Sequence, residues 1–180
     1  MRAISRFLLW GLFFFAAAGG AADTVEKRYP LGERGTLALN VPAGWAEEVR
    51  RKDNLPQTVF YSPAGKQQVM VTPLWRARPD LPPFSRASVR QNVEQGLKAI
   101  RSQALEQDIP IVEFRGKGGA GWYYDATDRA PKPGEFAYLR QGMLMVSGEL
   151  VLWFTILTND RKDPALAGAM RMLQGAEHTK

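Results

Sequence analysis

The sequence predicts an α+β fold, a layered domain in which helices flank a mainly antiparallel sheet. Short runs of alternating apolar and polar residues, separated by glycine and proline turns, predict antiparallel strands. One strand-length run, 150–157, is apolar on both faces, which predicts a strand that is covered on both sides. Two other runs carry apolar residues at helical spacing and predict the flanking helices.

The first half of the chain carries the predicted strands of the amino-terminal hairpins. The first strand begins at Gly35, and Pro42 ends it. The apolar side chains that alternate along one of its faces are Leu37, Leu39 and Val41. Three more short runs, each bounded by turn residues, lie at 45–50, 57–61 and 67–74. The proline-rich segment 75–83 then forms a crossover loop, because proline lacks an amide donor and holds the backbone extended.

Two helices are predicted, one in the middle of the chain and one near its end. The first covers about residues 86–105 and starts near Ser85. Its apolar stripe consists of Val89, Val93, Leu97 and Ile100. The second starts at Asp163-Pro164, where a capping residue precedes a proline in the first helical position, and it ends near Gly175.

Strand-forming residues resume after the first helix, at 109–114, 121–127 and 136–158. The last part of this region, 150–157, has no polar face, so it should lie in the centre of the sheet with Trp153 fully covered. A turn at Ser147-Gly148 leads into it, and Gln141-Gly142 is the alternative position for that turn.

The amino-terminal segment 1–22 is typical of a secretory signal peptide. Arg2 and Arg6 precede the apolar run 7–18, and small residues follow before the first acidic residue. The alternative is an uncleaved membrane anchor, but the run is shorter than the roughly 20 apolar residues that a spanning helix needs. We therefore expect a periplasmic or secreted protein with a single domain over 23–180 and no integral membrane span after cleavage.

Composition argues against several classes of function. The net charge of +6 falls to +4 without the signal peptide, and acidic residues are interspersed with basic ones, so a nucleic-acid partner is not expected. The chain has no cysteine and one histidine, His178, in a segment expected to fray. We therefore expect no catalytic residue, no metal site, no cofactor and no enzymatic activity. A serine hydrolase is the remaining catalytic alternative, although none of its conceivable nucleophiles lies in a nucleophile-elbow motif: Ser88, Ser102 and Ser147.

The glycine-rich segment 116–121 fits the pattern Gly-x-Gly-x-x-Gly, but a strand follows it instead of the helix that a dinucleotide site requires. It is expected to be a mobile hairpin loop that tolerates shortening. Asp125 and Asp128 have no third potential ligand nearby and are interpreted as strand-edge and turn residues. The aromatic residues at strand spacing are expected to pack mainly in the core.

Several ordered segments resemble the PsbP-like fold family: Leu37–Trp45, a mid-chain helix, Gly121–Tyr124 and Gly148–Leu157. This group includes the PsbP protein of photosystem II, a Ran-binding nuclear import factor and bacterial envelope proteins similar to DcrB. The resemblance implies an α/β/α sandwich that acts as an accessory or partner-binding module. These motifs are structural, and none of them matches a metal-binding or docking residue of the family.

The leading hypothesis is therefore an exported, non-enzymatic binding or accessory module of the bacterial cell envelope, with an envelope protein or an anionic surface as its partner. The alternative is a periplasmic protein that binds a small ligand or lipid, with Met143 and Met145 lining a cleft between the sheet and a helix. The first function needs an exposed contact surface, and the second needs a cleft.

Four arginines near the crossover loop are the candidate partner-binding residues: Arg76, Arg78, Arg86 and Arg90. The first two lie on the same side of an extended segment, and the last two lie one helical turn apart, so all four side chains could face one direction. Of the acidic residues, only Asp80 lies within this stretch of sequence. The patch would suit an acidic partner or anionic lipid headgroups, and an ordinary solvated surface is the alternative.

Overall fold

The computed structural model describes residues 23–52, 55–76, 78 and 80–180, so the predicted signal peptide lies outside the described residues. Seven strands form an antiparallel sheet in the order β3-β4-β5-β9-β8-β7-β6, and three form a second sheet in the order β1-β2-β10. The strands of the large sheet are β3 (Ala46–Lys52), β4 (Leu55–Tyr61), β5 (Gln67–Trp75), β6 (Val112–Gly116), β7 (Gly119–Thr127), β8 (Tyr138–Met145) and β9 (Leu150–Thr158). The remaining strands and α-helices are β1 (Thr24–Pro30), β2 (Thr36–Pro42), β10 (Glu177–Thr179), α1 (Arg86–Ile100) and α2 (Pro164–Gln174), and two 3₁₀ helices cover Gly32–Arg34 and Pro63–Gly65.

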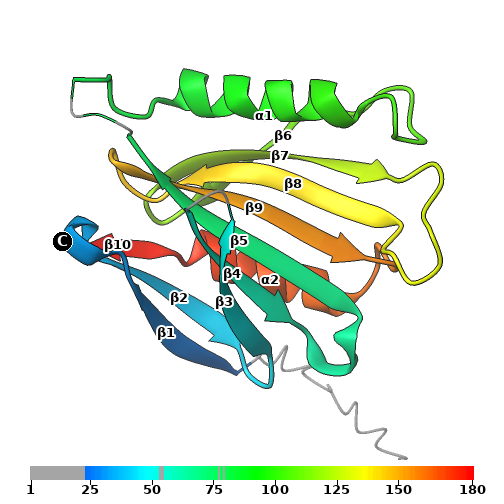
Figure 1. Cartoon of the computed structure of the whole chain (residues 1–180), viewed down its shortest axis with the longest axis horizontal. Coiled ribbons are helices and arrows are strands. Elements are labelled where there is room, and N and C mark those ends of the chain that lie inside the picture. Colours follow the sequence, from blue (N-terminus) through cyan, green and yellow to red (C-terminus); the bar gives the residue numbers. More distant parts are fainter. Residues whose placement is uncertain (1–22, 53–54, 77, 79) are drawn as a thin grey trace, which may run out of the picture.

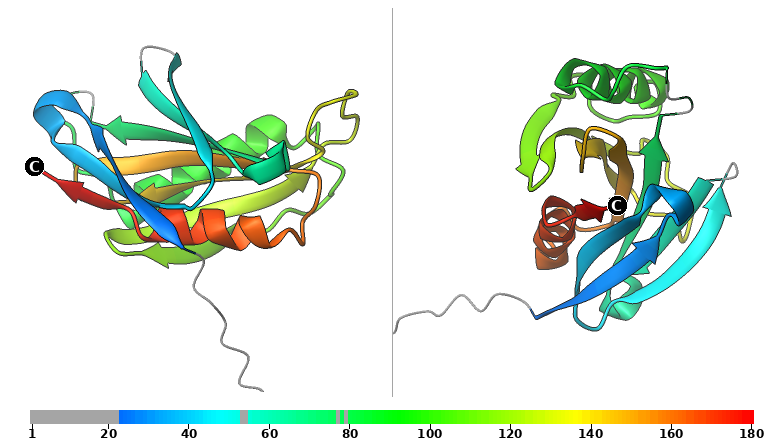
Figure 2. Two further views of the ribbon diagram at one scale, coloured as in Figure 1. Left: turned by 90° about the horizontal axis from the view of Figure 1, so that it is seen from below. Right: turned by 90° about the vertical axis from the view of Figure 1, so that its left-hand side faces the viewer.

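The elements form three layers, and the large sheet is the middle one (Figures 1 and 2). Helix α1 packs on β7 and β8 from one side, and α2 lies on the opposite side, where it contacts β2, β5 and β6. The small sheet shares this second side with α2 (Figure 2). The α+β prediction is confirmed, and so is the central place of β9, which has three strands on either side of it. No helix in the described part of the chain is long and apolar enough to span a membrane.

Strands β1 and β10 are the elements that the sequence pattern does not predict. Strand β1 is an edge strand with exposed, mostly charged or polar residues, so it has no alternating apolar face. Strand β10 has three residues and pairs with β2 through His178 opposite Leu37. The expectation that the segment around His178 frays is therefore wrong, because backbone pairing with β2 holds it in place.

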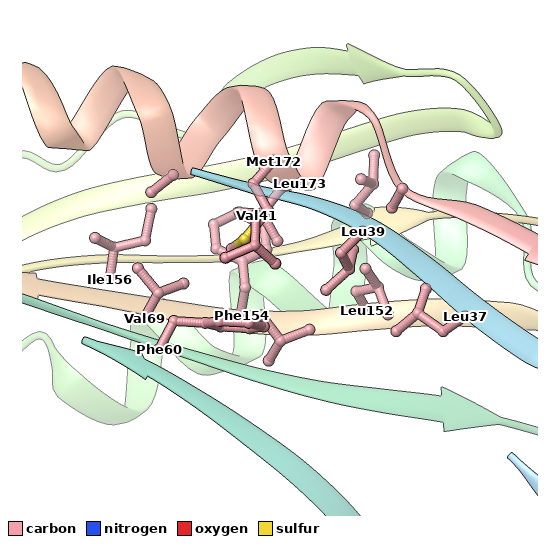
Figure 3. Close-up of a cluster of buried hydrophobic side chains, with 14 of the residues drawn as sticks. Leu37, Leu39, Val41, Phe60, Val69, Leu152, Phe154, Ile156, Met172 and Leu173 are labelled. Atoms are coloured by element: carbon pink, nitrogen blue, oxygen red, sulfur yellow. The ribbon is translucent and has the colours of Figure 1, made fainter. Parts of the chain in front are cut away.

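The main core lies between β9 and the layer formed by α2 and β2. Phe154 of β9 is completely buried there, together with Phe60 of β4 and Leu39 of β2. Figure 3 shows the side chains from these strands and from α2 pointing toward one another. This packing explains why Leu150, Leu152, Phe154 and Ile156, the alternate residues of β9 in this core, are apolar.

The other face of β9 is less completely covered. Val151 is buried beneath α1, but Trp153 and Thr155 are only partly buried. The Trp153 ring lies against Gly96 of α1, where an added Cβ would be 3.1 Å from the ring. The prediction that Trp153 is fully covered is wrong, because α1 covers β7 and β8 and does not extend over β5 and β4.

Both helix starts are confirmed, but the first helix is shorter than predicted. The Ser85 side chain accepts a hydrogen bond from the Ser88 amide, and the Asp163 carboxylate accepts one from the Ala165 amide, so both helices have the expected caps. Helix α1 ends at Ile100 instead of near 105. The chain then leaves the helix because its backbone pairs with the end of β7 through Leu105 N–H to Thr127 O and an Ala104–Asp128 bridge.

The segment 116–121 is a tight β6–β7 connection packed against the protein. The amide of Lys117 donates to the Gln174 carbonyl over 2.9 Å, which ties the turn to the end of α2. A Cβ at Gly118 would lie 1.9 Å from the carbonyl oxygen of Val146. The prediction of a mobile loop that tolerates shortening is therefore wrong: these glycines permit close backbone approach.

Replacing Gly118 by alanine should lower the free energy of unfolding by about 1–3 kcal/mol, because the β6–β7 turn must shift away from Val146. Gly148→Ala is the matched control, since an added Cβ there meets nothing within 4 Å. Urea denaturation of both variants measures the difference. Equal stability of the two variants would contradict the close packing of the β6–β7 turn.

The turn into β9 is confirmed at Ser147-Gly148. The Val146 and Ser147 amides both donate to the Leu150 carbonyl, at 3.0 and 3.1 Å. The alternative position is wrong, because Gly142 lies inside β8, where an added Cβ would be 2.8 Å from the Phe154 ring.

Glu106 links the segment after α1 to the end of β7. Its carboxylate accepts hydrogen bonds from the Thr127 amide at 2.8 Å and the Thr127 hydroxyl at 2.6 Å, and it pairs with Arg161. Burial opposes ionisation, but these hydrogen bonds outweigh it and lower the pKa of Glu106 to about 2. Glu106 is therefore more acidic in the folded protein than in the unfolded chain, where a glutamate has a pKa of about 4.3.

This lowered pKa predicts a contribution of Glu106 to acid sensitivity. The carboxylate stabilises the fold fully above about pH 5, and that stabilisation is lost as the pH falls toward 2. Glu106→Gln should be less stable at neutral pH and should lose less stability between pH 5 and 2. Denaturation midpoints across this range test it; parallel pH profiles for the two proteins would contradict the prediction.

Candidate functional site

Each of the four arginines of the predicted patch forms an ion pair with a carboxylate in the structure. Arg76 lies 3.6 Å from the Glu149 carboxylate and donates to the Leu81 carbonyl at 2.9 Å. Arg78, which is exposed, lies 3.5 Å from Asp80. Both lie on the crossover loop between β5 and α1, and Arg76 contacts the turn that precedes β9 through Glu149.

The two helical arginines also have carboxylate partners. Arg86 pairs with Glu113 of β6 at 2.9 Å and lies over the Trp122 ring, and Arg90 pairs with Glu94 one helical turn along α1 at 3.0 Å. The scarcity of acidic residues in the local sequence is therefore misleading, because the partners of Arg76 and Arg86 come from distant segments. Their role in partner binding stays a prediction.

A pocket of about 400 Å3 lies beside Arg76, at the end of the molecule that carries the carboxyl terminus (Figure 1). We call it the terminal pocket. The residues that line it are Leu31, Glu33, Arg34, Trp75, Glu149, Leu150, His178 and Lys180. They come from the 3₁₀ helix between β1 and β2, the end of β5, the β8–β9 turn and the carboxyl terminus. Four segments far apart in the sequence thus build one concave site.

Local backbone geometry sets the position of the 3₁₀ helix in this site. Gly35 has a φ of 90° and directly follows Arg34, and an added Cβ would lie 2.1 Å from the Thr179 carbonyl oxygen. A glycine is required there both by the positive φ and by the close approach of β10. The arrangement brings Arg34 and Lys180 to the same pocket.

Arg34 lies over an aromatic ring. Its guanidinium carbon lies 4.7 Å from the centroid of the Trp75 ring. The N–H donors of a guanidinium lie in its own plane, so contact with an aromatic face does not use them as hydrogen-bond donors. Among the residues that the structure describes, no carboxylate pairs with Arg34 and no acceptor takes a hydrogen bond from its guanidinium.

Glu149 also lines the terminal pocket, and two cations contact its carboxylate. Lys180 and Arg76 contact different oxygens of its carboxylate. The hydrogen bond from Lys180 is the main cause of a lowered pKa of Glu149, and the nearby charges of Lys180, Arg76 and His178 add to it. The carboxylate is therefore ionised and already paired at neutral pH.

His178 is held on both sides of its ring. Its Nε2 lies 2.6 Å from the Arg34 carbonyl oxygen and its Nδ1 lies 3.0 Å from the Ser147 hydroxyl. Because a carbonyl can only accept, Nε2 carries the proton in the neutral ring, and Nδ1 accepts from Ser147. The Ser147 oxygen also accepts from the amides of Glu149 and Leu150, at 3.3 and 3.2 Å.

The candidate nucleophile Ser147 therefore has a histidine as its hydrogen-bond partner, a contact that the sequence did not predict. The imidazole nevertheless hydrogen-bonds a backbone carbonyl and not a carboxylate, and the serine oxygen is used to close the β8–β9 turn. Within the described chain, no three His, Asp or Glu side chains lie close enough to hold a metal ion. The pair fastens β10 to the rest of the pocket wall.

The alternative hypothesis from the sequence, a small-ligand or lipid-binding protein, placed a binding cleft at two methionines. Met143 is 2% exposed and belongs to the core beneath α1, and Met145 is only partly buried beside it. A cleft at these positions is therefore wrong. A smaller pocket of about 240 Å3 is formed by residues of β4, β5, β8 and β9. Its lining residues are Leu55, Gln57, Met70, Thr72, Leu74, Gln141, Trp153 and Thr155.

Comparisons with known proteins support the fold. No family model matches the sequence, and no curated protein is significantly similar to it. The cyanobacterial PsbP protein (CyanoP) of Synechocystis superposes with a TM-score of 0.56 over 94% of this chain and 100% of its own, at 11% sequence identity. A protein from Bacteroides thetaiotaomicron superposes with a TM-score of 0.51 at 12% identity over 80% of this chain, which spans 45% of that protein's length. At such low identity the similarity concerns the fold alone: the chain has a PsbP-like fold.

Proposed function

We propose that this chain is an exported, non-enzymatic binding module of the bacterial cell envelope, and that it binds its partner at the terminal pocket. The observation that carries the proposal is the pocket itself, which combines apolar lining residues with Arg34, whose guanidinium has no hydrogen-bond acceptor among the described residues. Concave sites of this size with a few polar groups are typical of binding sites. The signal-like segment 1–22 supports export.

A binding role fits the polar side chains of the pocket better than catalysis. Ser147 and His178 hydrogen-bond each other and the backbone, and they hold the β8–β9 turn and β10 in place. Glu149 is neutralised by Lys180 and Arg76, so it is a weak base. The group left for an external partner is Arg34, which can bind but does not supply a nucleophile or a base.

The predicted arginines enter the proposal at the rim of the pocket. Arg76 contacts the pocket residue Glu149, and Arg78 is exposed two positions farther along the loop. Arg86 and Arg90 lie on the first turns of α1. We propose that an acidic envelope protein contacts this side of the molecule, with the attraction weakening as salt concentration rises.

Site-specific photocrosslinking in whole cells tests this function. A photoreactive amino acid at Glu33, an exposed residue of the pocket rim, should give one discrete adduct with an envelope protein. Lys132 is the matched control position, because it is exposed on the β7–β8 connection at the opposite end of the molecule (Figure 1). Adducts that are absent, or that are the same from both positions, would contradict the proposal.

Export is tested separately on the same cells. The protein should appear in the periplasmic or secreted fraction, and its intact mass should correspond to a chain that begins near Asp23. A cytoplasmic protein that retains residues 1–22 would overturn the envelope location.

A further inference from the structure

We infer that the terminal pocket binds a small organic monocarboxylate with an apolar body. The carboxylate would bind the Arg34 guanidinium, and the apolar body would lie against Leu31, Trp75 and Leu150. This inference rests on the proposed function, since it names the ligand chemistry of the same pocket. It goes beyond a protein–protein contact because it predicts recognition of one charged group.

Arg34 is prepared for a planar anion by its position over Trp75. The contact, with the guanidinium carbon 4.7 Å from the ring centroid, holds the Arg34 side chain against Trp75 and so reduces the conformational freedom that ligand binding would otherwise remove. The in-plane N–H groups form a fork that matches the two oxygens of a carboxylate. Within the described residues these donors have no acceptor, so a ligand would not have to displace an internal partner.

The other charges of the pocket favour a single negative charge on the ligand. Lys180 and Arg76 both contact Glu149, so these three groups together carry one net positive charge, which the negative charge of Glu33 in the same pocket offsets. Glu33 lines the same pocket and would repel a doubly charged group such as phosphate. Arg34 is therefore matched by one carboxylate better than by a dianion.

The rest of the pocket suits an apolar body. Three apolar side chains line it: Leu150 is almost fully buried, and Leu31 and Trp75 are partly buried. His178 uses both ring nitrogens in contacts to Ser147 and to the Arg34 carbonyl, so it offers no further polar group to a ligand. A volume of about 400 Å3 is at the small end of the range for ligand sites, which points to a small molecule.

An NMR titration of the mature protein with 3-phenylpropionate tests the inference. We expect saturable shifts of amide signals around Arg34, Trp75 and Leu150. The neutral 3-phenylpropanamide has the same apolar body and should bind at least tenfold more weakly, because it lacks the charge that pairs with the guanidinium. Absence of shifts with the carboxylate, or equal affinity for the amide, would overturn the inference.

Variants of Arg34 identify the group responsible. Arg34→Gln should weaken binding of 3-phenylpropionate at least tenfold, and Arg34→Lys should restore it only in part, because lysine lacks the planar fork. Arg101→Gln is the matched control, since Arg101 is exposed at the far end of α1 and should leave binding unchanged. Each variant's amide spectrum reports whether it is folded. Wild-type affinity of a folded Arg34→Gln protein would overturn the inference.

The titration and the crosslinking experiment can fail independently. Carboxylate binding without a crosslinked envelope protein would leave the ligand inference standing and overturn the partner proposal. A discrete crosslink from Glu33 without any shift of amide signals on adding the carboxylate would support the partner proposal and overturn the ligand inference.

Discussion

Replacing Phe154 by alanine should lower the free energy of unfolding by about 3–5 kcal/mol, which is a large part of the total for a small domain. Phe154 is 0% exposed on the central strand β9. Its ring meets the Phe114 ring edge to face, with the centroids 5.8 Å apart. Truncation leaves a cavity between the large sheet and the α2 layer, because the backbones on both sides are fixed by strand and helix hydrogen bonds. Urea denaturation followed by circular dichroism measures the loss.

Trp153→Ala is the matched control on the neighbouring residue of the same strand. The sequence pattern alone predicts a loss of about 3–5 kcal/mol for this change, because it treats both faces of β9 as fully covered. The structure predicts a smaller loss than for Phe154→Ala, since Trp153 is partly exposed and rests on the edge of α1 at Gly96. A Trp153→Ala protein as unstable as Phe154→Ala would contradict the different burial of the two faces.

The central position of β9 and the caps of both helices could be predicted because they depend on local sequence. The unbroken apolar run of β9 requires a covered strand, and Asp163-Pro164 and Ser85 carry their helix-start chemistry within a few residues. The small sheet could not be predicted in the same way. Strand β1 has an exposed, charged surface, and β10 is too short to show a period, so their pairing with β2 depends on tertiary structure.

The terminal pocket was beyond sequence reasoning for a related reason. The pocket brings together Arg34, Trp75 and His178, which belong to segments far apart in the sequence. No local sequence pattern predicts that they lie side by side. Composition identified His178 as the sole histidine but could not reveal its contact with Ser147, which depends on the register of β10 on β2. The ion partners of Arg76 and Arg86 were missed because Glu149 and Glu113 follow long after them in the chain.

Asp125 is another residue whose importance the sequence understates. The sequence interpretation was a strand-edge carboxylate, but Asp125 lies within β7 and accepts two hydrogen bonds from Arg140 of β8, both at 2.7 Å. The Arg140 guanidinium also lies 4.2 Å from the Tyr123 ring centroid. Burial alone would lower the pKa of Arg140, but the hydrogen bonds and charge of Asp125 raise it on balance, so the guanidinium stays charged.

Replacing Asp125 by alanine should therefore lower the free energy of unfolding by about 2–4 kcal/mol. The Arg140 side chain is 15% exposed, so loss of its partner leaves a largely buried cation without a counter-charge. This loss of unfolding free energy is slightly smaller than the loss expected when a fully buried ion pair is broken, because Asp125 is 33% exposed and water can partly replace it. Equilibrium denaturation at neutral pH measures this loss.

The double variant Asp125→Ala with Arg140→Met distinguishes an uncompensated charge from a loss of packing. Methionine keeps much of the apolar stem of Arg140 over Tyr123 but removes the charge, so the double variant should be more stable than Asp125→Ala alone. Free energies from the complete cycle give the coupling between the two residues. If the two single losses simply add, the salt bridge contributes no coupling, and the low stability of Asp125→Ala would have to come from lost packing in β7 instead.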